Sequence, residues 1–114
     1  MLVLRPDQMD ALAAPHRERF VRKTLDNLAR VFPGDPRLAG EAAVRALIDD
    51  AWARAAGYGI ARERELALFI YLVFEHGPGF EKQAERRWME AILTNAALNG
   101  AMKMDLIYAR LQKA

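Results

Sequence analysis

Apolar residues recur along most of the chain at the three- and four-residue spacing of an amphipathic α-helix. The clearest stripe runs through Phe20, Leu25, Leu28 and Phe32, and charged residues occupy the positions between them. This spacing predicts a helix over residues 15–32, with one apolar face turned toward a core.

Short breaks rich in proline and glycine separate the periodic stretches. We expect Pro15 to separate the first two helices, Gly57 to provide a left-handed cap, and Asn99 or Gly100 to cap the last helix. The pattern predicts helices over residues 6–13, 15–32, 38–56, 61–76, 81–97 and 102–113.

The helix predicted over residues 61–76 differs from the others because its second half is apolar on every side. A helix of this kind is buried, and in a small domain it lies at the centre. A buried strand is the alternative, but no second strand-like segment exists to pair with it. The prediction is a compact all-α bundle of five or six helices, forming a single domain over residues 1–114.

The helix predicted over residues 81–97 has a polar and an apolar side. Its apolar face consists of Ala84, Trp88, Ile92 and Leu93. The side chains expected to point outward are those of Glu81, Lys82, Arg86 and Arg87.

The composition removes several classes of enzyme. The chain has no cysteine and no serine, and its two histidines are His16 and His76. Thiolate metal sites, disulfides and serine or cysteine nucleophiles are therefore excluded. We expect His76 to cap the end of the central helix. The prediction is a protein that is not an enzyme and has no catalytic residue, metal or cofactor.

Charge is mixed along the chain, with a formal net charge of +2. Dispersed charge of this kind disfavours a nucleic-acid partner, which requires clustered Lys and Arg. The nearest approach to a basic face is Arg17, Arg19, Arg22 and Lys23. A small helical DNA-binding or regulatory protein that uses this face is the alternative function.

The longest apolar run covers only residues 66–74, whereas a membrane span needs about 20 residues. The first residues lack the basic region and apolar core of a secretory signal. We therefore expect no membrane partner and a cytoplasmic location.

Two loops carry aromatic or apolar residues between glycines. Tyr58 and Ile60 lie in one, and Pro78 and Phe80 lie in the other. Because exposed loops often carry function, we predict that these four residues bind a protein partner. The alternative is that Phe80 packs back onto the bundle and fixes the following helix.

Several short segments resemble a group of small bacterial proteins found near the genes of type VI secretion spike (VgrG) and PAAR-type proteins. The matching segments are Leu4-Arg5-Pro6-Asp7-Gln8, Phe20 with Phe32-Pro33, Arg54-Ala55-Ala56-Gly57-Tyr58-Gly59-Ile60 with Glu63-Arg64-Glu65, and Phe74 with Gly77-Pro78-Gly79-Phe80. The resemblance implies a helical adaptor, chaperone or immunity-like helper that binds a spike or effector component. It carries over no catalytic residue. The chain departs from the family after Phe80, where an extended stretch is expected and residues 81–87 read as continuous helix.

Together these inferences predict a non-enzymatic protein-interaction module. A homo-oligomer is also compatible with the sequence. Met102 and Met104 either add an adaptable surface or fill gaps in the core.

Overall fold

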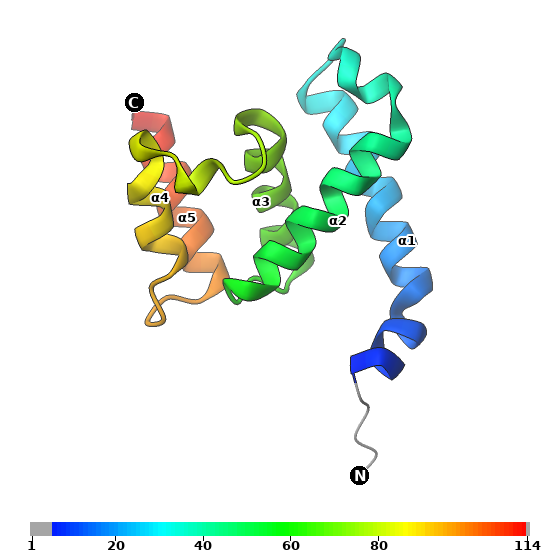
Figure 1. Cartoon of the computed structure of the whole chain (residues 1–114), viewed down its shortest axis with the longest axis horizontal. Coiled ribbons are helices and arrows are strands. Elements are labelled where there is room, and N and C mark those ends of the chain that lie inside the picture. The colour runs from blue at the N-terminus through cyan, green and yellow to red at the C-terminus, as the bar shows by residue number, and fades with distance from the viewer. Residues whose placement is uncertain (1–5, 114) are drawn as a thin grey trace. The chain divides into compact units, whose positions relative to one another are not determined.

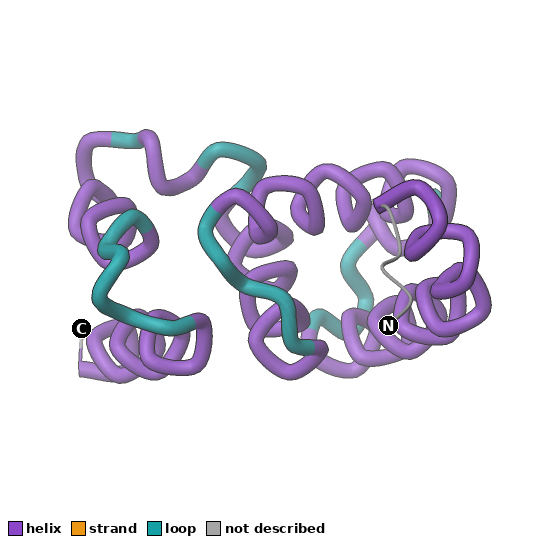
Figure 2. Tube along the Cα trace, turned by 90° about the horizontal axis from the view of Figure 1, so that it is seen from below, coloured by secondary structure: helices purple, strands orange, loops and turns teal. Residues whose placement is uncertain are grey.

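A computed structural model describes residues 6–113, and the side chains of residues 16–112. The described chain contains α-helices and short 3₁₀ helices joined by loops, and no strand (Figure 2). The all-α prediction is confirmed. The helices fall into two compact units, one ending at Glu41 and one beginning at Ala42, and each is described by itself.

The first unit contains α1 (Pro6–Val31) and the 3₁₀ helix η1 (Pro36–Ala39). The predicted break at Pro15 is wrong, because α1 continues through it. A proline removes one backbone hydrogen bond and crowds the preceding turn, which is a local cost. Strong helix formers, including Ala13 and Ala14, precede it and sustain the helix.

Two residues of the predicted apolar stripe, Phe20 and Leu28, are buried in α1, whereas Leu25 and Phe32 are half-buried. Phe20, Val21 and Leu28 are each at most 5% exposed, and Thr24 lies on the same face at 1%. The helix ends before a turn in which Gly34 has a φ of +78°.

In that turn the Asp35 side chain accepts a hydrogen bond from the backbone N–H of Arg37 at 2.9 Å and thereby caps η1. Proline and glycine thus end α1 where the sequence predicts.

The second unit begins at Ala42, the second residue of α2 (Glu41–Gly57). It also contains α3 (Glu63–His76), α4 (Arg87–Leu93) and α5 (Gly100–Lys113). Helices α3 and α4 both pack against α5 (Figure 1). The Tyr108 hydroxyl on α5 donates a hydrogen bond to the backbone carbonyl of Leu68 on α3 at 2.6 Å. This bond fixes the position of α5 along α3.

Helix α3 matches the predicted central helix closely. Its apolar side chains are buried on most sides, which confirms the prediction from its all-round apolar pattern. The buried residues of α3 are Glu65, Leu66, Phe69, Ile70, Leu72, Val73 and Phe74.

The continuous helix predicted over residues 81–97 is wrong. Two 3₁₀ helices, η2 (Phe80–Lys82) and η3 (Ala84–Arg86), precede α4, and Gln83 between them is extended, with φ −75° and ψ 144°. The physical reason is Glu81, whose side chain is fully buried and anchors η2 instead of facing water. The continuous helix on which the departure from the type VI secretion group rested is therefore absent, and the resemblance itself stays a prediction.

Because α4 begins only at Arg87, its register differs from the one predicted. Met89 and Leu93 are buried, whereas Ala84, assigned to the apolar face, is exposed. The Asn99 side chain caps α5 by accepting a hydrogen bond from the N–H of Met102 at 2.9 Å, as predicted.

The left-handed residue after α2 is Gly59 rather than Gly57. Gly59 has a φ of +75°, whereas Gly57 is the last residue of α2 and is helical. No described helix is both long enough and apolar enough to cross a bilayer.

The two glycines Gly57 and Gly77 offer a matched test of this backbone. Gly77 caps α3 with φ +97° and ψ 157°, a region that is open almost only to glycine. We expect Gly77→Ala to lower the free energy of unfolding by about 1–3 kcal/mol. Gly57→Ala, with open space around its Cβ, should be neutral or stabilise by up to about 1 kcal/mol. Urea unfolding followed by circular dichroism measures both, and an equal loss for the two variants would contradict the assignment.

Candidate functional site

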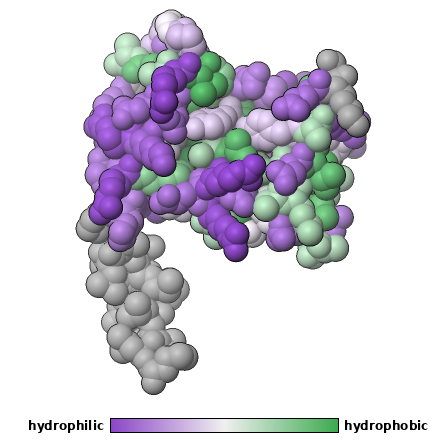
Figure 3. Space-filling view, turned by 180° about the vertical axis from the view of Figure 1, so that it is seen from behind, coloured by the Kyte–Doolittle hydropathy of each residue, from purple (hydrophilic) through white to green (hydrophobic). Residues whose placement is uncertain are grey.

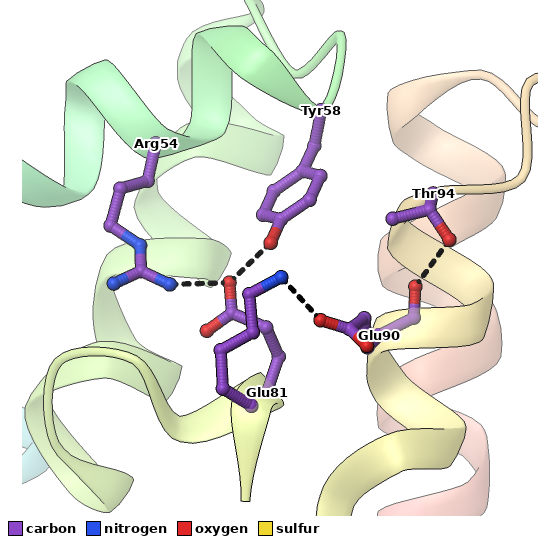
Figure 4. Close-up of polar contacts among 6 residues, drawn as sticks. Arg54, Tyr58, Glu81, Glu90 and Thr94 are labelled. Atoms are coloured by element: carbon purple, nitrogen blue, oxygen red, sulfur yellow. Dashed lines mark hydrogen bonds and ion pairs between the residues drawn. The ribbon is translucent and has the colours of Figure 1, made fainter.

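The two loops singled out in the sequence come together at a buried carboxylate. Glu81 Oε2 accepts a hydrogen bond from Arg54 Nη2 at 2.7 Å and another from the Tyr58 hydroxyl at 2.6 Å. Arg54 lies in the last turn of α2 and Tyr58 directly follows that helix, and both point toward Glu81 on η2 (Figure 4). The Glu81 side chain is fully buried, and that of Arg54 is 28% exposed. This Arg54–Tyr58–Glu81 cluster ties the second loop to α2.

Glycines shape the second loop so that it can reach the cluster. Gly77 and Gly79 both have positive φ, so the chain reverses sharply after α3. A Cβ built on Gly79 would lie 3.5 Å from Arg54 Nη1, so the guanidinium runs close to this backbone. The turn presents Phe80 and Glu81 to the interior in succession.

Aromatic rings form the apolar side of the same junction. The Phe69 ring on α3 lies 6.1 Å from the ring of Tyr58 and 5.9 Å from that of Phe80. The His76 ring lies 5.9 Å from the Phe80 ring on its other side. Tilted pairs at these separations are favourable. The loops are therefore held by both a polar and an aromatic contact.

The cluster changes the acidity of its members. Burial alone would raise the pKa of Glu81, but the hydrogen bonds from Tyr58 and Arg54 outweigh it and lower the pKa below its ordinary value. Burial and the bonded Glu81 carboxylate raise the pKa of Tyr58 to about 12. Burial opposes the charge of Arg54, but its bond to Glu81 raises the pKa of Arg54 overall. The folded protein therefore favours the ionised carboxylate, the neutral phenol and the charged guanidinium.

A second buried charge secures the first loop. Lys103 on α5 is 5% exposed, and its Nζ donates a hydrogen bond to the backbone carbonyl of Tyr58 at 2.6 Å. A Cβ built on Gly100 would lie 3.5 Å from the Cα of Ile60, so the start of α5 also contacts this loop.

The four residues predicted to bind a partner have different environments. Pro78 is exposed and Tyr58 is half-buried, but Ile60 and Phe80 are 1% and 0% exposed. An exposed Pro78–Phe80 anchor is therefore wrong, and Phe80 packs back into the unit against Phe69 and His76. The partner-binding role of the loops stays a prediction.

The sequence analysis missed Glu81, which it placed on an outward face. A signal was present at the end of α2, because Tyr58 directly follows the helix and lies four residues after Arg54, a spacing that places two side chains on the same side of a helical turn. A cation and a hydroxyl aligned in this way can share one carboxylate.

His76 lies at the end of α3, as predicted. The last backbone bond of α3 comes from Gly77, whose N–H donates to the carbonyl of Val73 at 2.8 Å. His76 Nε2 is buried without a hydrogen-bond partner among the described residues and lies 3.9 Å from a Glu75 carboxylate oxygen.

The basic residues of α1 are exposed, and Arg22 is among those engaged within their own unit. Arg22 Nη1 lies 3.1 Å from Glu41 Oε1 in an ion pair. In the described part of the chain, no three His, Asp or Glu side chains come together as metal ligands would.

Comparison with known proteins adds nothing to this geometry, since no family model, curated protein or solved structure matches the chain. Of the segments that resemble the type VI secretion group, the first begins at Leu4 and lies partly outside the described residues.

The lowered pKa of Glu81 predicts how the stability of the protein changes at acidic pH. A carboxylate with a lowered folded pKa adds stability above its unfolded pKa, near 4.3, and this stability is lost as the pH falls through the folded value. We expect Glu81→Gln to lose about 1–3 kcal/mol of unfolding free energy at pH 7 and to lose less stability than the wild type on acidification.

Urea unfolding between pH 7 and pH 2 measures this difference. Glu85→Gln, whose side chain is 68% exposed and lies in the same segment, is the control and should differ little from the wild type. Equal behaviour of the two variants would count against a structural role for the Glu81 carboxylate.

Proposed function

We propose that this chain is a non-enzymatic protein-interaction module that acts in the cytoplasm as a helper of type VI secretion. In this proposal it binds a spike or effector component as an adaptor, chaperone or immunity-like protein. The proposal is supported by the resemblance of its short segments to proteins found near VgrG and PAAR-type genes. The absence of serine and cysteine from the chain favours binding over nucleophilic chemistry.

The observation that carries the proposal is an exposed apolar face on α5. Met102 and Leu106 are 49% and 48% exposed and lie one helical turn apart, so their side chains are neighbours. Met104 and Ile107 on the opposite side of α5 are fully buried. Figure 3 shows apolar side chains gathered over the part of this unit that contains α4 and α5. Single exposed apolar residues are ordinary, but a contiguous pair on a fixed helix suits a partner.

Polar contacts border this face. Asp105 lies between the two apolar residues in sequence and pairs with Arg64 on α3 at 3.6 Å. The guanidinium of Arg110 lies 4.3 Å from the centre of the Trp88 ring, in a cation–π contact. An apolar centre with a polar border is typical of protein interfaces. In this proposal Met102 and Leu106 form the centre, and the Tyr58 and Pro78 loops provide further contacts.

Co-purification of the full chain with spike and effector proteins encoded beside its gene tests the proposal. We expect a stable complex, and we expect Met102→Glu combined with Leu106→Glu to abolish it while changing stability by about 0.5 kcal/mol or less at each site. Val31→Glu is the matched control, because Val31 is a 54% exposed apolar residue in the other unit. Failure to retain any of these proteins, or equal loss of binding in the control, would overturn the proposal.

A further inference from the structure

A small pocket lies where the first turns of α3 and α5 meet. Its volume is about 250 Å³. This volume lies below the range of pockets that hold drug-sized molecules, so the pocket suits a smaller ligand. The residues that line it are Gly59, Ala61, Arg62, Glu65, Asn99, Gly100 and Ala101.

One side chain in this pocket stands out by its lack of a partner. Glu65 is 4% exposed, and its carboxylate has no hydrogen bond or ion pair with any residue that the structure describes. The other buried charges of this unit, Glu81 and Lys103, each have polar partners at 2.6–2.7 Å. Among the described residues the sealed side-chain atoms without a partner are His76 Nε2 and Glu81 Oε1, so the Glu65 oxygens are instead open to the water of the pocket. The Glu65 carboxylate is therefore in a position to accept hydrogen bonds from a ligand in the pocket.

Glu65 also does not form the capping hydrogen bond to the backbone of Arg62 that its position in α3 allows. It is the third residue of α3, from which a glutamate often reaches back to the backbone N–H of the capping residue. No such bond forms with Arg62, and Arg62 in turn supplies no side-chain cap. The Glu65 carboxylate is thus not used in capping α3, and it lines the pocket.

The first turn of α5 also lines the pocket, and it offers donors. Asn99 takes two first-turn N–H groups of α5, those of Met102 at 2.9 Å and Lys103 at 3.0 Å. The preceding residues, Gly100 and Ala101, line the pocket and belong to the same positively polarised helix end. The exposed Arg62 adds a full positive charge at the edge. The start of α5 and Arg62 together suit an anionic group.

We propose that the pocket binds a free α-amino acid in its zwitterionic form. The ammonium group donates to the Glu65 carboxylate, and the ligand carboxylate accepts from the first turn of α5 and from Arg62. An ammonium carries three donors and a carboxylate only acceptors, so one small molecule matches both the Glu65 carboxylate and the donors of α5 and Arg62. The ligand site is separate from the proposed secretion role and stands whether or not that role is correct.

Two-dimensional ¹H–¹⁵N NMR of the full chain, titrated with each standard amino acid, tests the proposal. We expect at least one amino acid to produce saturable shifts centred on the amides of Gly59, Gly100 and Ala101. The N-acetyl derivative and the carboxamide of the same amino acid each lack one charge, and both should bind at least about tenfold more weakly.

Variants separate the two ends of the ligand. Glu65→Gln keeps the shape of the side chain and should weaken binding about tenfold or more, and Arg62→Gln should weaken it as well. Glu63→Gln removes a charge from the same helical turn but not from the pocket lining, so it should bind like the wild type. The native spectrum of each variant confirms that it is folded.

Three results would overturn the proposal. The first is the absence of amide shifts with every amino acid up to its solubility. The second is an N-acetyl derivative that binds as tightly as its parent, which would make the pocket a simple anion site. The third is Glu65→Gln binding as tightly as Glu63→Gln.

Discussion

The second unit depends on the bond pair that Glu81 Oε2 accepts from Arg54 and Tyr58. A single buried carboxylate joins the end of α2 to the segment that follows α3, which are far apart in sequence. Without that anchor, residues 80–86 have little reason to form two short 3₁₀ helices in place of an α-helix. The late start of α4 and the burial of Met89 follow from this, because the register of α4 is set by where the irregular segment ends.

The parts of the fold that the sequence predicts well are those in which local and tertiary preferences agree. The stripe around Phe20 and Leu28, the central helix α3 and the Asn99 cap are readable because spacing, capping and burial point to the same structure. The break predicted at Pro15 fails because a strong local signal is outweighed by the helical preference of the flanking residues. The helix predicted over residues 81–87 is wrong for a different reason, because a long-range contact overrides the local helical pattern.

The candidate site is harder to predict because its polar residues are ordinary in type. Nothing local distinguishes the buried Glu81 from the exposed Glu85, since only the loop that places Arg54 and Tyr58 opposite Glu81 makes the difference. The positions of the two loops can be predicted from their glycines, and the structure brings the loops together. The sequence pattern does not show which loop side chains face inward. Ile60 and Phe80 are therefore predicted to contact a partner, but they are buried and hold the loops in place.

The contrast between the two methionines of α5 has a chemical consequence. Met104 is sealed in the core, whereas the thioether of Met102 belongs to a residue that is 49% exposed. Oxidants reach exposed methionines first and convert the thioether to a polar, chiral sulfoxide. The proposed contact surface is therefore also the part of α5 most sensitive to oxidation, and a methionine sulfoxide reductase could restore it without the core being disturbed.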